Sequence, residues 1–162
     1  MSTDEIRKRV VLRASRTRVW EALTDSKQFG TWFGCEFDEP FQAGARVHGR
    51  VVPTKVDPEA AKAQEAYAGV EFDVFVERIE PMTHFSFRWH PGDETPDPPF
   101  PDAQMTTVTF EIADAEDGVL LTIIESGFDR VPLERRAKVF EMNDGGWAAQ
   151  TTLITKYLRD AS

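Results

Sequence analysis

The segment from Pro132 to Ser162 holds the feature that most constrains the fold, a helical pattern between Phe140 and Leu158. Five residues in it recur at steps of seven, four, three and four, which places them on one helix face: Phe140, Trp147, Thr151, Ile154 and Leu158. Charged residues occupy much of the remaining surface: Glu134, Arg135, Arg136, Lys138, Glu141, Lys156 and Arg159. An amphipathic helix buries its apolar face against another element, which we expect to be a sheet.

Two glycines interrupt this helix. Gly145 and Gly146 each cost roughly 1 kcal/mol relative to alanine inside a helix, so their presence needs a reason. We interpret them as a sign of close packing, of a kink, or of a gap that faces a ligand. The alternative is a tolerated weak point beside a helix cap.

The charge balance narrows the range of partners. The chain has 162 residues, with 28 acidic and 19 basic side chains and a formal net charge of -9. Nucleic acids and anionic membrane surfaces repel such a chain, so we expect neither as a partner. The basic run Arg7, Lys8 and Arg9 fits a solvated strand face better than a binding patch.

The single cysteine fits a reducing compartment, and the hydropathy of the chain bears on whether it carries a signal peptide or a membrane span. Cys35 is the only cysteine, so an intramolecular disulfide cannot form, and we expect a buried small hydrophobe there rather than a reactive thiol. The N-terminal sequence MSTDEIRKRV lacks the apolar core of a signal peptide, and no window approaches the roughly 18 apolar residues of a membrane span. We therefore expect a cytoplasmic protein.

Alternating apolar and polar residues predict six strands. They lie near Glu5 to Arg13, Ala45 to Pro53, Val70 to Glu80, Phe85 to Trp89, Thr107 to Ile112 and Leu121 to Ile123. In the strand from Val70 to Glu80, the alternation of apolar and polar residues breaks at Ile79, which indicates a bulge near Glu77.

Short helices and two irregular segments fill the remaining sequence. One short helix follows its cap Ser15, and another runs from Ser26 to Phe33 and ends at Gly34. Residues 55–68 have helix propensity without a clear apolar face, and we treat them as an insertion. Residues 91–102 are rich in proline and acids and predict a loop.

These elements predict an α+β fold in a single domain over residues 1–162. Short connections make neighbouring strands antiparallel, because parallel pairs need long crossovers. A curved sheet that wraps the long C-terminal helix would bury Trp147, while the two short helices close one end and leave space between helix and sheet.

Three segments resemble the SRPBCC or START-like superfamily, in particular the AHSA-like branch named after an activator of a heat-shock chaperone ATPase. They are residues 19–33, with VWEALTD, Phe29 and Trp32-Phe33; residues 79–89, with IEP and FSFRW; and residues 125–147, with ESGF and MNDGGW. The resemblance implies a helix-grip fold with an apolar cavity between helix and sheet. It also implies binding of small hydrophobic molecules, lipids or polyketide-like aromatics, or in one branch a chaperone. The insertion and the proline-rich loop depart from the pattern, so the pocket size does not carry over.

An aromatic cavity is the strongest candidate binding site. Binding sites are mostly apolar with few placed polar groups, and seven residues would line this one: Trp32, Phe33, Phe72, Phe87, Trp89, Met142 and Trp147. The alternative is a filled core built from the same side chains.

Polar candidates are few. Arg88, His90 and Glu125 are the candidate polar groups of the cavity, Arg88 as a partner for a substrate carboxylate and Glu125 because it precedes Gly127 near a cavity end. All three histidines, His48, His84 and His90, share the parity of solvent-facing residues, and His90 beside Pro91 is the least disfavoured of them. Metal-ligand spacings, nucleophile motifs and phosphate loops are missing from the sequence, so we expect neither a metal nor a cofactor.

Three functions therefore stay open. The first is binding of a small hydrophobic or aromatic ligand in the cavity. The second is a cyclase or hydrolase acting on an aromatic or polyketide-like substrate, which needs a polar side chain inside that cavity. The third is an interaction module that stimulates a chaperone ATPase, which needs an exposed patch. The identity of the ligand and the oligomeric state are not determined by the sequence.

Overall fold

The computed structural model describes residues 5–92 and 100–160 of the chain. One seven-stranded sheet has the order β1-β7-β6-β5-β4-β3-β2, and every neighbouring pair is antiparallel. The strands are β1 (Glu5–Leu12), β2 (Cys35–Phe37), β3 (Arg46–Val51), β4 (Glu71–Glu80), β5 (His84–Trp89), β6 (Thr106–Ala115) and β7 (Gly118–Ser126). The predicted α+β class with an antiparallel sheet is confirmed.

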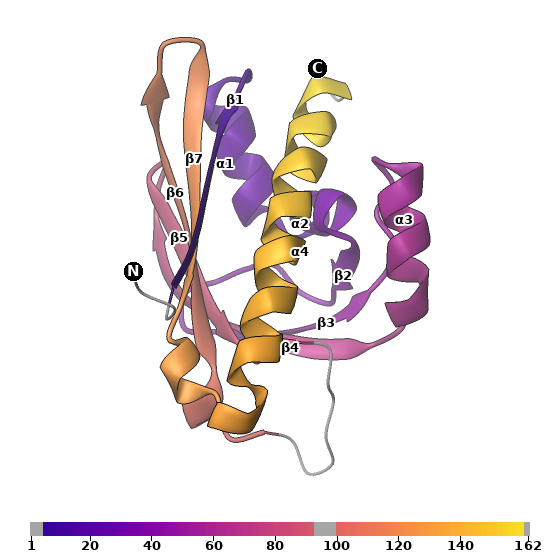
Figure 1. Ribbon diagram of the computed structural model, residues 1–162. Coiled ribbons are helices and arrows are strands. Elements are labelled where there is room, and N and C mark those ends of the chain that lie inside the picture. The colour runs from indigo at the N-terminus through magenta and orange to yellow at the C-terminus, as the bar shows by residue number, and fades with distance from the viewer. Residues whose placement is uncertain (1–4, 93–99, 161–162) are drawn as a thin grey trace.

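Helices lie on one side of the curved sheet. They are α1 (Arg16–Thr24), α2 (Ser26–Phe33), α3 (Pro58–Gln64) and α4 (Leu133–Asp160), with 3₁₀ turns η1 (Glu65–Tyr67), η2 (Asp102–Gln104) and η3 (Phe128–Arg130). Figure 1 shows α4 held against the bent sheet, with α1 and α2 packed beside it and α3 standing near the ends of β3 and β4. This is the helix-grip arrangement that the sequence predicts. Within the described residues, no helix is both long and apolar enough to cross a bilayer.

The two short helices begin and end as the sequence predicts. Ser15 Oγ accepts from the backbone N–H of Arg18 at 3.2 Å and caps α1. Asp25 caps α2 in the same way. Gly34 ends α2 in the left-handed region with φ of 103°, a conformation that glycine adopts without a Cβ clash.

Strand pairing adds one element and confirms one irregularity. The short strand β2 pairs with β3 and is absent from the sequence prediction, because three residues are too few for a periodicity to show. The register of β4 against β5 shifts between Val76 and Arg78, which confirms the bulge near Glu77.

The buried face of α4 differs partly from the predicted one. Trp147, Ile154 and Leu158 are at most 3 % exposed, whereas Phe140 and Thr151 are half-buried. Val139 and Leu153 are also buried, which widens the apolar face beyond the predicted residues.

The glycine pair of α4 lies at exposed positions of a continuous helix. A Cβ added at either Gly145 or Gly146 would meet no atom within 4 Å apart from its chain neighbours and the adjacent backbone of α4 itself. The interpretation of close packing is therefore wrong, and the glycines face open space on the surface of the helix.

Candidate ligand site between the long helix and the sheet

Aromatic rings fill the space between α4, α2 and the concave face of the sheet. We call these rings the interior aromatic cluster: Phe29, Trp32, Phe33, Phe37, Phe41, Phe72, Phe85, Phe87, Trp89, Phe110 and Trp147. Neighbouring rings in it have centroids 4.9 to 6.4 Å apart. Tilted and edge-to-face pairs at such distances contribute beyond the burial of apolar area.

The cluster is buried at one end and reaches the surface at the other. Trp32 and Phe87 are at most 1 % exposed. Phe33, Phe72 and Trp89 are half-buried, and the Trp89 ring lies 6.0 Å from that of Phe33 and 6.4 Å from that of Phe72. We call these three rings the open end of the cluster.

Most of the proposed cavity residues come together in this cluster. Six of the seven belong to it: Trp32, Phe33, Phe72, Phe87, Trp89 and Trp147. Met142 is half-buried on α4 and lies outside the packed core of the described residues. The Trp32 indole N–H donates to the carbonyl of Ala22 at 2.8 Å, which ties this ring to α1.

Glu125 is a fully buried carboxylate beside the cluster. Its Oε1 accepts from Asn143 Nδ2 and from the Trp147 indole, both at 2.8 Å. Its Oε2 accepts from the Trp89 indole at 2.9 Å and from Thr106 Oγ1 at 2.6 Å. These bonds join β5, β6, β7 and α4 at a single side chain.

The four donors match the full acceptor capacity of an ionised carboxylate. Glu125 therefore fixes the half-buried ring of Trp89 and the buried ring of Trp147. A carboxylate with every lone-pair direction occupied is poorly prepared to accept a proton from a substrate.

Sequence reasoning placed Glu125 near the cavity but missed two of its partners. Thr106 shares the inward parity of Val108, and Asn143 comes one helical turn before Trp147. These two spacings are the sequence signals that could have identified Thr106 and Asn143 as partners of Glu125.

Arg88 lies on the opposite face of the sheet. Its Nε is 3.1 Å from Glu77 Oε1, and its guanidinium carbon lies 5.0 Å from the centre of the Phe75 ring. The structure thus does not bring Arg88 to the interior aromatic cluster.

The histidines also lie away from the cluster. His90 follows β5, with Nε2 at 3.8 Å from Asp102, and burial lowers its pKa. His48 lies on the outer face between Asp73 and Glu71, whose hydrogen bonds raise its pKa. Cys35 is 4 % exposed, and burial raises the pKa of its thiol, as expected for a structural cysteine.

The insertion lies next to the open end. Gln64 at the end of α3 accepts from the Thr54 N–H at 2.7 Å and donates to the Phe33 carbonyl at 3.2 Å. Lys156 of α4 donates to Asp57, the N-cap of α3, at 2.6 Å. Helix α3 has no fully buried residue, although Ala60 packs against the core, and these polar contacts hold its two ends.

A family model supplies the evidence for the family to which the chain belongs. The model described as "Activator of Hsp90 ATPase homolog 1-like protein" matches residues 13–159. The chain belongs to this family. No curated protein matches the chain.

Several solved structures share this fold. A protein of Mesorhizobium loti, MLL2253, aligns with a TM-score of 0.70 at 20 % identity, over 98 % of both chains. The Aha1 dimer of Colwellia psychrerythraea aligns with a TM-score of 0.67 at 15 % identity, over 95 % of both chains. DynU16, a protein in the dynemicin biosynthetic locus, aligns with a TM-score of 0.66 at 23 % identity, over 98 % of this chain and 48 % of its own. This chain thus spans about half the length of DynU16, and the likeness extends to the fold alone.

Proposed function

We propose that this activator-like protein binds a small, mainly apolar aromatic molecule at the open end of the interior aromatic cluster. The observation that carries the proposal is the partial exposure of Phe33, Phe72 and Trp89. With Phe37, which neighbours Phe72, they are the half-buried rings of a cluster whose other rings are buried. The free energy of the system falls when a flat apolar ligand covers aromatic surface that is in contact with water.

The packing of the cluster sets the manner of binding. The rings already contact one another, so a ligand either stacks on the open end or displaces Phe33 or Phe72. Trp89 and Trp147 are held by Glu125, and we expect them to form the fixed wall of the site. Helix α3 lies next to this end, where Gln64 donates to the Phe33 carbonyl, and we expect α3 to be the segment that gives way.

The two other functions receive less support. Glu125 is a buried polar side chain beside the cluster, and its four bonds leave it committed to holding rings rather than to acid–base chemistry. A chaperone-binding patch would need contiguous apolar surface. The large apolar side chains exposed among the described residues come from β1, η1 and α4: Val11, Tyr67 and Leu133.

Fluorescence titration tests the proposal. N-phenyl-1-naphthylamine, which carries no charge, serves as the aromatic probe, and a panel of aromatic metabolites and lipids serves as competitors. Phe72→Ala removes one half-buried ring of the site, while Phe75→Ala, the matched control, removes a half-buried ring from the opposite face of the same strand. A partly covered ring contributes about 1 kcal/mol, so we expect about fivefold weaker binding in Phe72→Ala.

The control decides the interpretation. Unchanged binding in Phe75→Ala together with weaker binding in Phe72→Ala supports the site. Equal loss in both variants, or no saturable binding of the probe to the unmodified protein, contradicts it.

A further inference from the structure

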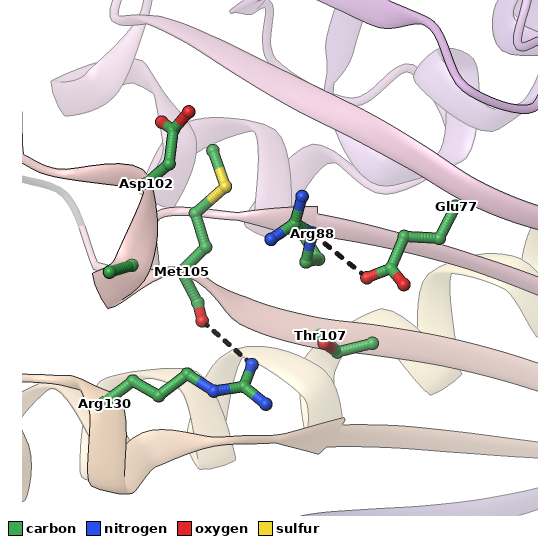
Figure 2. A pocket seen from close by; sticks show the side chains of 7 residues that line it. Glu77, Arg88, Asp102, Met105, Thr107 and Arg130 are labelled. Atoms are coloured by element: carbon green, nitrogen blue, oxygen red, sulfur yellow. Dashed lines mark hydrogen bonds and ion pairs between the residues drawn. The ribbon is translucent and has the colours of Figure 1, made fainter.

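A second site lies on the outer face of the sheet, away from the interior aromatic cluster. A pocket of about 340 Å³ opens there, within the range of small-molecule sites. Its lining comes from β4, β5, β6 and the two 3₁₀ turns η2 and η3: Glu77, Arg88, Asp102, Ala103, Met105, Thr107 and Arg130. Figure 2 shows Arg88 and Arg130 entering it from different sides.

The sheet places three of these groups side by side. Arg88 on β5 is directly opposite Phe75 on β4 and opposite Thr107 on β6. All three point to the outer face, because Phe87, Val108 and Val76 at the alternate positions are buried inside. The Thr107 hydroxyl therefore lies next to the Arg88 side chain by the register of the sheet.

Both guanidinium groups are held in place by neighbours. Arg88 stacks over Phe75 and uses Nε, the innermost nitrogen, for its ion pair with Glu77. Figure 2 shows the two terminal nitrogens of Arg88 on the side away from Glu77. Arg130 donates from Nη1 to the Met105 carbonyl at 3.3 Å, a neutral acceptor. Two oriented guanidiniums are a suitable arrangement for an anion with paired oxygens.

The acidic groups at the rim already have cationic partners. Asp102 Oδ2 lies 3.0 Å from Arg46, whose second terminal nitrogen lies 3.3 Å from Asp73. Glu77 is paired with Arg88. Within residues 5–92 and 100–160, no ion pair joins Arg130 to a carboxylate, so its charge is available to a ligand in the pocket.

We propose that this pocket binds the oxyanion group of a small molecule, a carboxylate or a phosphate, between Arg88, Thr107 and Arg130. Such a site is unexpected on a chain with a net charge of -9, which repels anions at long range. Short-range pairing with two guanidiniums and a hydroxyl overcomes that repulsion at this point. The neighbouring carboxylates favour a ligand of low charge over a polyanion.

The test is an NMR titration of the ¹⁵N-labelled protein at constant ionic strength. One arm uses inorganic phosphate and the other uses acetate, so the preferred oxyanion is read from the two dissociation constants. We expect saturable shifts at the amides of Thr107 and Arg130. A hydrogen-bonded charge contact contributes enough for Arg130→Gln to weaken binding about tenfold.

Matched variants separate the site from general charge effects. Thr107→Val keeps the strand propensity and removes only the hydroxyl, and we expect it to weaken binding as well. Arg78→Gln removes an exposed arginine of the same sheet that pairs with Glu80 and does not line the pocket, and we expect no change. Thermal unfolding of each variant confirms that it is folded.

Three results would overturn the proposal. They are the absence of saturable shifts with both anions, unchanged affinity in Arg130→Gln, and equal loss of affinity in Arg78→Gln. Because the pocket and the open end of the aromatic cluster face opposite sides of the sheet, either proposal can fail without the other.

Discussion

Replacing Glu125 by glutamine isolates the buried carboxylate with almost no change in volume. The glutamine side chain would keep one oxygen that accepts two hydrogen bonds, but its amide nitrogen would face two groups that now donate. On the Oε2 side, the Thr106 hydroxyl is able to rotate and accept, whereas the Trp89 indole N–H has no such option. At least one buried donor is then left without an acceptor.

The magnitude follows from this count. An unsatisfied buried donor costs about 1–3 kcal/mol, and the three surviving bonds lose the reinforcement of a charged acceptor, which adds about 1–2 kcal/mol. We therefore expect Glu125→Gln to lower the free energy of unfolding by about 2–5 kcal/mol. For a domain of this size, that corresponds to a fall in Tm of about 5–15 °C.

Urea denaturation followed by far-UV circular dichroism measures this difference. Glu111→Gln is the control, since Glu111 is exposed on β6 and its replacement should change the free energy of unfolding by less than about 0.5 kcal/mol. A loss below about 1 kcal/mol in Glu125→Gln, at an unchanged m-value, would refute the view that this carboxylate fixes the tryptophan wall.

Three further predictions concern the insertion, a surface histidine and the buried thiol. Lys156→Met breaks the bond to Asp57, so amide hydrogen exchange in α3 should accelerate while global stability changes by less than about 1 kcal/mol; unchanged exchange would show that α3 is held in another way. The raised pKa of His48 means that its ion pairs stabilise the fold fully below the unfolded-state pKa and lose this effect as pH rises through the folded pKa. His48→Gln should therefore be less stable than the unmodified protein by under about 1 kcal/mol at pH 6, and the difference should vanish at pH 9; an equal difference at both pH values would contradict this. Native Cys35 should react with a thiol reagent at least about a hundredfold more slowly than the urea-unfolded chain, and a comparable rate would show that the thiol is accessible.

The fold was largely predictable because its signals are local and repeated. The period-two row Phe85, Phe87 and Trp89 and the helical spacing around Trp147 each mark a buried face, and short connections leave only antiparallel neighbours. The interpretation of the glycine pair was wrong because the sequence shows only that glycine destabilises a helix. Whether a neighbouring element packs against the glycines depends on the tertiary structure. At Gly145 and Gly146, open space lies opposite.

The site was less predictable because its polar contacts are long-range. Parity places Glu125 on the inner face of β7, but it does not reveal that Asn143, Thr106 and two indoles converge on one carboxylate. The same limit applies to Arg88. Its parity places it on the outer face, and only the folding of η3 brings Arg130 to the same pocket.

The central claim is that a small aromatic molecule is held at the open end of the interior aromatic cluster. Isotope-filtered NOE spectroscopy on the ¹³C,¹⁵N-labelled protein, with a saturating unlabelled ligand from the competitor panel, tests it most directly. We predict NOEs from ligand protons to the rings of Phe33, Phe72 and Trp89. NOEs confined to other surfaces, or no ligand in the panel that gives any, would contradict it.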